Sequence, residues 1–178
     1  MKFIEQLASY VPSLIVEHLV ADQREVPPPW RQKFQTVCVF CDVSGFTALS
    51  EHMALNGMGA EGLAKHLNSY FSQMVNLIAA DGGDVFKFAG DAIILLWSES
   101  NDSTMETIVR RAAQCAFAIQ HSLHAAELQD GVRLSVKIGI GVGDISVLHI
   151  GGVHGRMEYV AVGEPLVQAF EAEHRAVA

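Results

Sequence analysis

Phe40-Cys41-Asp42-Val43-Ser44-Gly45-Phe46-Thr47 ends a short apolar strand in an aspartate and then turns toward a helix. A second segment, Lys87-Phe88-Ala89-Gly90-Asp91, places another aspartate just before the apolar run from Ile93 to Trp97. Two carboxylates at neighbouring ends of adjacent strands can hold a pair of hard divalent cations, which prefer oxygen ligands. The residues after Asp42 are small or hydroxylic, so their backbone N–H groups suit a phosphate. Together the two segments predict a site for phosphoryl or nucleotidyl transfer.

The regions around these segments predict the fold. Apolar residues recur every three or four positions from Ala60 to Ile78, and a capping box, Ser103-x-x-Glu106, opens a second long helix. Strands are expected at 36–41, 84–88, 92–97, 134–142, 144–150 and 157–162, with a final helix from Glu164. The order strand, helix, strand, strand, helix, strand is that of a ferredoxin-like α+β fold, with helices on one face of an antiparallel sheet. In that fold the first strand neighbours the hairpin, which brings Asp42 and Asp91 together.

The chain divides into an N-terminal extension, residues 1–35, and one domain, residues 36–178. Pro27-Pro28-Pro29 cannot continue a helix and acts as a stiff spacer between them. The sequence stops at Ala178 inside a helix-like stretch, which indicates a domain truncated at its C-terminus.

Composition limits the partners. The chain has 178 residues, 50% of them hydrophobic, and a net charge of −8 without a run of Lys or Arg, so nucleic acid is not an expected partner. Neither a signal peptide nor an apolar stretch of membrane-spanning length is visible, which indicates a soluble cytoplasmic protein with no membrane span. The three cysteines, Cys38, Cys41 and Cys115, do not form a zinc or disulfide pattern and are expected in the core.

Asp42-Val43-Ser44-Gly45-Phe46-Thr47, followed by Gly82 to Ala92 with its Lys87-Phe88-Ala89-Gly90-Asp91, resembles the class III nucleotidyl cyclases. Among them it is most similar to the first catalytic domain of the soluble, bicarbonate-responsive adenylyl cyclases. The similarity extends to Val11-Pro12-Ser13-Leu14-Ile15-Val16 and to Val136-Lys137-Ile138-Gly139-Ile140.

The resemblance implies a reaction and its ligands. ATP would be converted to cyclic AMP and pyrophosphate, with two Mg²⁺ ions, replaceable by Mn²⁺, on Asp42, Asp91 and the Val43 carbonyl. Ser44, Gly45, Phe46 and Thr47 would bind phosphate. Lys87 would recognise the base or a small anion.

The same resemblance implies that half of the site is missing. In the family, a complementary domain supplies an asparagine, an arginine and base-reading residues, but this chain has Val167, Glu171 and Val160 at those positions. The chain is therefore expected to be the metal-binding half of a heterodimeric or intramolecular pair. Alone, or as a homodimer, it is expected to be inactive or weak. The arginine that would bind bicarbonate with Lys87 is replaced by Phe170, so bicarbonate activation is expected to be weak or absent.

Several alternatives stay open at this level. Asp42 could cap the following helix, Asp91 could be a simple turn residue, and Lys87 could extend into solvent. Asp84 is expected to start a strand and to face away from Lys87. The whole chain could be a non-catalytic regulatory module that keeps the fold and binds nucleotide or a small anion. Gly82-Gly83-Asp84-Val85-Phe86 also resembles a diguanylate cyclase signature, although at a different place in the hairpin.

Two further expectations concern the C-terminal half. Gly139, Gly141 and Gly143 do not form a dinucleotide-binding motif and indicate close backbone approach to a neighbouring element. His149 and His154 are expected at the surface.

Overall fold

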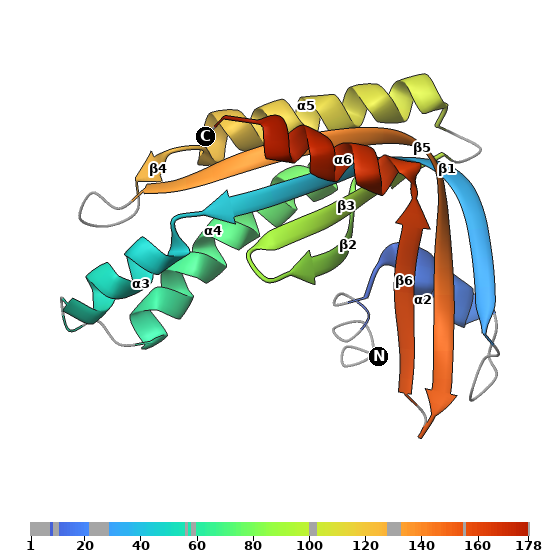
Figure 1. The fold of residues 1–178 in the computed structure, drawn as a ribbon, viewed down its shortest axis with the longest axis horizontal. Coiled ribbons are helices and arrows are strands. Elements are labelled where there is room, and N and C mark those ends of the chain that lie inside the picture. The colour runs from blue at the N-terminus through green and yellow to red at the C-terminus, as the bar shows by residue number, and fades with distance from the viewer. Residues whose placement is uncertain are drawn as a thin grey trace.

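An antiparallel sheet of six strands organises the chain, in the order β2-β3-β1-β5-β4 with β6 paired to β5. The computed structural model describes Ala8 and residues 11–21, 29–55, 57, 60–99, 103–127, 133–154 and 156–177. The elements are α2 Ser13–Ala21, β1 Trp30–Ser44, α3 Phe46–Leu55, α4 Ala60–Ala80, β2 Asp84–Ala89, β3 Ala92–Ser98, α5 Met105–Leu123, β4 Ala126–Glu127, β5 Arg133–Val153, β6 Arg156–Gly163 and α6 Glu164–Arg175 (Figure 1). The α+β class and the central strand order agree with the sequence-based expectation.

Three local details differ from that expectation. β1 begins at Trp30 because residues 30–35 already pair with β5. β5 is one continuous strand instead of two, because Gly143 takes a φ of +147° and lets the strand bend without breaking its pairing with β1. The cap of α5 is Thr104, whose side chain accepts a hydrogen bond from the Thr107 N–H, so the predicted capping box at Ser103 is wrong.

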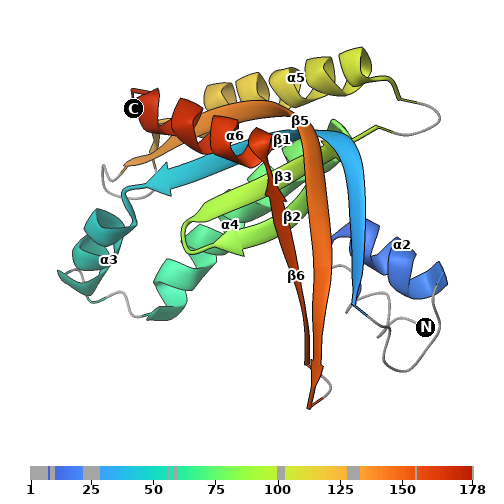
Figure 2. The same ribbon diagram turned by 45° about the vertical axis from the view of Figure 1, so that its right-hand side comes forward.

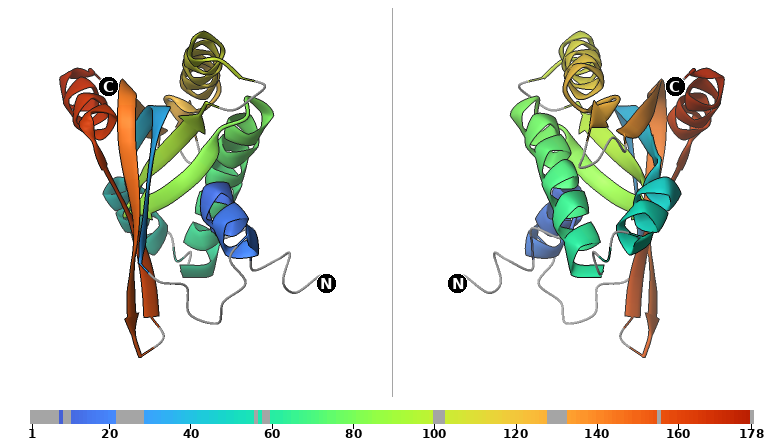
Figure 3. Two further views of the ribbon diagram at one scale, coloured as in Figure 1. Left: turned by 90° about the vertical axis from the view of Figure 1, so that its right-hand side faces the viewer. Right: turned by 90° about the vertical axis from the view of Figure 1, so that its left-hand side faces the viewer.

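One face of the sheet is sealed by α4 and α5, and we call it the α4/α5 face (Figure 3). Side chains alternate along β1, and those that point to this face are at most 1% exposed: Val37, Val39, Cys41 and Val43. Tyr70 of α4 lies in this core and donates its hydroxyl to the Leu123 carbonyl of α5 at 3.3 Å. Burying this much apolar surface is the main stabilising term of the fold.

The opposite side, the α6 face, is covered differently. Helix α6 lies directly on β5 because Gly139 and Gly141 have no side chain there (Figure 3). A Cβ atom at Gly139 would lie 1.8 Å from the Ala169 carbonyl oxygen, and one at Gly141 would lie 2.0 Å from that of Pro165. This close packing is the backbone approach that the glycine pattern predicts.

Helix α2 lies beside the arm formed by β5, β6 and the start of β1 (Figure 2). Its first turn is held by Asp84 of β2, which accepts hydrogen bonds from the Ser13 N–H at 2.8 Å and the Ser13 hydroxyl at 3.3 Å. Burial raises the pKa of Asp84, and these hydrogen bonds oppose the rise. Asp84 therefore caps a helix that lies far from it in sequence.

A β-bulge between Val85 and Lys87 changes which side of the sheet the side chains of β2 point to after the bulge. Simple alternation predicts that Asp84 and Lys87 face opposite sides, and this prediction is wrong. Asp84 pairs with Leu96 and Lys87 with Ile94, so the bulge brings both polar side chains to the same side of the strand.

At the arm, His18 of α2 packs on Trp30 at 4.0 Å between ring centroids, and His149 of β5 lies 5.7 Å from the same Trp30 ring. His149 is only 3% exposed, so its expected surface position is wrong. Docking of α2, which strand periodicity could not show, buries it. His154 is exposed, as predicted.

Candidate active site

Asp42 and Asp91 lie side by side at one end of the sheet. Asp42 of β1 pairs in register with Ala92 of β3, and Asp91 immediately precedes Ala92 in the β2–β3 turn. Figure 1 shows the end of β1, this turn and α3 at the same end of the molecule. The register confirms that the fold brings the two segments together.

A cation also faces Asp42, from a residue that the sequence reasoning did not select. Lys137 of β5 pairs in register with Asp42 on the side opposite to β3. Burial and the nearby Asp91 raise the pKa of Asp42, whereas Lys137 lowers it. Strand alternation alone could not identify Lys137, because its importance depends on the register between β1 and β5.

The two carboxylates fit a divalent cation. Burial and, after it, the neighbouring Asp91 carboxylate disfavour the charged form of Asp42, and a cation bound between the two carboxylates would offset both effects. Among the residues that the structure describes, no group of three or more His, Cys, Asp or Glu side chains gathers at one point. A metal here would complete its coordination with backbone, water and phosphate oxygens, as Mg²⁺ commonly does.

The turn after Asp42 leads directly into α3. The Val43 side chain is buried in the α4/α5 core, so its backbone carbonyl is the group it can offer as a ligand. Gly45 has a φ of +108°, and a Cβ there would lie 2.8 Å from the Arg133 carbonyl oxygen. Glycine is therefore needed to make this turn.

Helix α3 begins at Phe46, and its first backbone N–H groups lack helical partners. The exposed Ser44 hydroxyl lies 3.5 Å from the Ser135 carbonyl oxygen. The backbone of Phe46 and Thr47 belongs to the first turn of α3, where an anion is favoured. The predicted phosphate-binding stretch thus occupies a helix N-terminus next to both aspartates.

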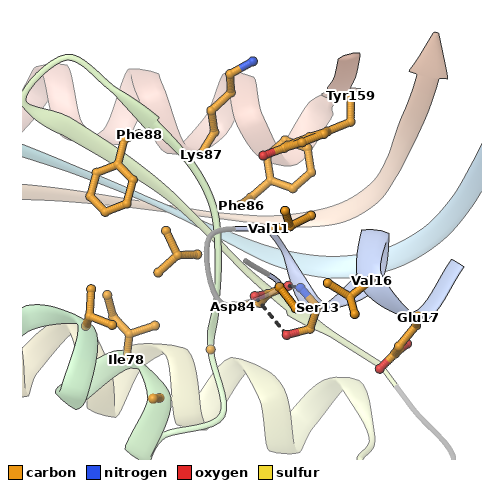
Figure 4. A pocket seen from close by; sticks show the side chains of 15 residues that line it. Val11, Ser13, Val16, Glu17, Ile78, Asp84, Phe86, Lys87, Phe88 and Tyr159 are labelled. Atoms are coloured by element: carbon orange, nitrogen blue, oxygen red, sulfur yellow. Dashed lines mark hydrogen bonds between the residues drawn. The ribbon is translucent and has the colours of Figure 1, made fainter. Parts of the chain in front are cut away.

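Lys87 lies on the edge strand, away from the carboxylate pair. Its ammonium is 4.0 Å from Glu158 and 5.6 Å from the centre of the Tyr159 ring, both on β6. The side chain is 46% exposed, so the ammonium is accessible. It borders a cavity of about 900 Å³ between β2, α4 and α2, where Phe88 and Val11 form part of the wall (Figure 4).

The positions expected to complete the site carry apolar or acidic groups. Val160 and Val167 are 38% and 49% exposed, and neither can donate a hydrogen bond from its side chain. Glu171 on α6 pairs with Arg175 at 3.6 Å. Phe170 packs edgewise on Phe40, with 4.6 Å between ring centroids, which places an apolar ring where a second cation would be needed.

Comparison with known proteins identifies the family. Residues 30–164 match the family described as the adenylate and guanylate cyclase catalytic domain, and the chain belongs to that family. Rat adenylate cyclase type 10 is 33% identical over 90% of this chain and 10% of its own length. Adenylate cyclase 1 of Rhizobium meliloti is 28% identical over 81% of this chain and 21% of its own. The chain thus spans about a tenth of the first of these relatives and about a fifth of the second.

The fold is also that of solved cyclase structures. The adenylyl cyclase CyaB from P. aeruginosa superposes with a TM-score of 0.66 and 24% identity, covering 84% of this chain and 76% of that one. The class III cyclase resemblance and its fold are therefore confirmed. Within the described residues, no helix has the length and apolar character needed to cross a membrane.

Proposed function

We propose that this chain is the metal-binding half of an adenylyl cyclase, which converts ATP to cyclic AMP and pyrophosphate when paired with a complementary domain. The observation that carries the proposal is the register of Asp42 with Ala92, which puts Asp42 beside Asp91. ATP is proposed over GTP because relatives such as the rat protein are named adenylate cyclases.

Asp42, Asp91 and the Val43 carbonyl would hold two Mg²⁺ ions, or Mn²⁺ in their place. When bound, the metals would lower the pKa of the ribose 3′-hydroxyl and neutralise the triphosphate. The reaction suited to this arrangement is in-line attack of the ribose 3′ oxygen on the α-phosphorus. That attack closes the cyclic diester and breaks the bond to pyrophosphate.

Other groups of this chain would bind and orient the substrate. The N–H groups at the start of α3, with Ser44 and Gly45, would bind phosphate oxygens, and Lys137 would add a positive charge beside Asp42. Lys87 would contact the base or a small anion from the accessible edge of β2. The complementary domain would supply the hydrogen-bond donors and the positive charge that Val160, Val167 and Glu171 do not offer.

A non-catalytic regulatory module is the second candidate. It is favoured by the same three positions, because a chain without a transition-state cation can bind nucleotide without turning it over. The presence of both metal-binding aspartates supports the enzyme over the module.

The test is an assay of cyclic AMP formation from ATP with Mg²⁺ or Mn²⁺. The purified chain is mixed with a cyclase domain that carries the asparagine and the arginine but has its own metal-binding aspartates replaced. Turnover that requires both chains supports the proposal. Binding of metal–ATP without turnover in the mixture supports the regulatory module instead.

A further inference from the structure

Three aromatic rings in a row connect two parts of the proposed site, the N-terminus of α3 and the turn that carries Asp91. Phe46, the first residue of α3, stacks on Phe71 of α4 at 6.0 Å between centroids and 18° between planes. Phe71 meets Phe88 of β2 edgewise, at 6.0 Å and 85°. The outer rings flank functional groups, since Phe46 follows the Gly45 turn and Phe88 lies shortly before Asp91.

The central ring is held firmly. Phe71 packs edgewise on Tyr70 at 5.9 Å and 88°. Tyr70 is 2% exposed, and its hydroxyl donates to the Leu123 carbonyl of α5. Phe71 is therefore attached to the α4–α5 core, while its outward contacts go to two separate segments.

Of the two outer segments, α3 is anchored in the core by buried Leu49 and Met53, whereas the end of β2 has little support of its own near the site. β2 is an edge strand whose paired neighbour is β3, and Phe88 is 52% exposed. Beyond Phe88 the hairpin tip contains Gly90, and a Cβ there would meet nothing within 4 Å. Phe88 is thus the last large side chain of β2 before Asp91, since only Ala89 and Gly90 follow it.

We propose that Phe71 is a positioning residue that fixes the distance between the Asp91 turn and the N-terminus of α3. Through Phe46 and Phe88 it makes the metal-binding carboxylate and the phosphate-binding amides face one triphosphate. Edge-to-face and stacked ring pairs add a modest stabilisation to that of burial, so Phe71 can hold one placement without dominating the stability of the fold. The inference rests on the proposed function and adds the element that sets the geometry of its site.

The first test measures geometry without catalysis. Nitroxide labels are placed at Glu51→Cys on α3 and Ala89→Cys at the end of β2, both exposed positions. The three native cysteines are buried, and burial raises the pKa of each thiol, so they label poorly. Phe71→Leu should broaden the distance distribution measured by pulsed electron resonance, whereas Phe117→Leu, at a 76% exposed ring on α5, should not. An unchanged distribution in Phe71→Leu would overturn the proposal.

The second test measures cyclic AMP formation by the chain paired with its complementary domain. Phe71→Leu should lower kcat by about 10²-fold, since small misplacements of reacting groups have effects of that size. KM for ATP and the melting temperature should change little, and Phe71→Tyr, which keeps the ring, should restore most of kcat. A kcat within twofold of the parent would overturn the proposal, and so would a loss that follows the melting temperature. If the unmodified pair has no activity, the proposed function fails instead, and the label distances still decide the role of Phe71.

Discussion

The two faces of β1 are covered to very different extents. On the α4/α5 face, coverage is complete along the strand, from Val37 to Val43. On the α6 face it is complete at Cys38 but only partial at Phe40 and at Asp42, which lies at the end of the strand. One face therefore provides the stability, and the charged groups collect where coverage of the other face ends.

The largest expected effect is the loss of activity when a carboxylate at the charged end of the α6 face is replaced. Asp42→Asn and Asp91→Asn should each reduce cyclic AMP formation by the proposed two-domain enzyme by at least ~10³-fold, because each variant would lose a proposed metal ligand and with it several kcal/mol of transition-state stabilisation. Circular dichroism and the melting temperature should stay at parent values. Turnover near the parent level in either variant would contradict the assigned site.

The isolated chain should be nearly silent in catalysis. A two-fold dimer of identical chains would face Asp42 and Asp91 with Val160, Val167 and Glu171, and losing one preorganised donor lowers rate by roughly 10²–10³-fold. Cyclic AMP made with Mg²⁺ or Mn²⁺ should therefore rise by at least ~10²-fold when the complementary domain is added. Equal rates with and without the complementary domain would show that other groups supply the missing charge.

Packing on the α6 face is tested by Gly139→Ala. Its Cβ would clash with the Ala169 carbonyl, and overpacking of this kind costs about 1–3 kcal/mol. Hydrogen exchange should show α6 opening, including loss of protection at the Val142 N–H, which donates to Gln168. Gly57→Ala is the control, because it brings only the strain of a φ of +69° in open space and should leave α6 protected. Unchanged α6 exchange in Gly139→Ala would refute the close packing.

A smaller effect is expected on the pH dependence of stability, through His149 of the arm. Burial, and after it the neighbouring His18, lower the pKa of His149 below the 6.5 of an exposed histidine. The unfolded chain therefore binds a proton at His149 more readily than the folded protein does. The contribution of neutral His149 to the free energy of unfolding is present above pH 6.5 and is lost as the pH falls toward the lowered pKa of the folded protein. Urea unfolding is measured at about pH 7.5 and about pH 5.5, which lie on either side of the reference histidine pKa. Between these two values the free energy of unfolding of His149→Gln should fall less than that of the parent. His121→Gln, at an exposed position on α5, should behave like the parent. The groups facing His149 are His18, Trp30 and, in register, Tyr159.

The smallest expected effect is the response to bicarbonate. The Lys87 ammonium already contacts Glu158 and the Tyr159 ring, and Phe170 carries no charge. A planar anion such as bicarbonate would therefore lack the two parallel hydrogen bonds that an arginine donates. Activity of the assembled enzyme at millimolar bicarbonate and fixed pH should change by less than about twofold, well under the tenfold that 1.4 kcal/mol of added binding would give. A several-fold rise would contradict this expectation.

Local sequence patterns predicted the central strands, the long helices and the adjacency of Asp42 and Asp91, but missed β4 and divided β5 into two strands. They succeeded because apolar periodicity and a short hairpin leave few ways to arrange β1, β2 and β3. The glycines of β5 likewise predicted a close neighbour, which is α6.

The parts that were missed depend on contacts between distant segments. Lys137 faces Asp42 only through the β1–β5 register, and His149 is buried only because α2 docks on the arm. The bulge at Phe86 overturned the facing of Asp84 because alternation assumes an unbroken ladder.

The cap that Asp84 provides for α2 bears on how the protein can be shortened. The family match begins at residue 30, which invites expression of a chain trimmed to that point. Such a chain would lose both Ser13 donors and leave the half-buried Asp84 carboxylate without them, at a cost of about 1–3 kcal/mol. It would also uncover the surface that Ile15 shares with Cys38 and Phe86. A chain trimmed to residue 30 should therefore be less stable than one that keeps Ser13 and Ile15, upstream of the triple proline.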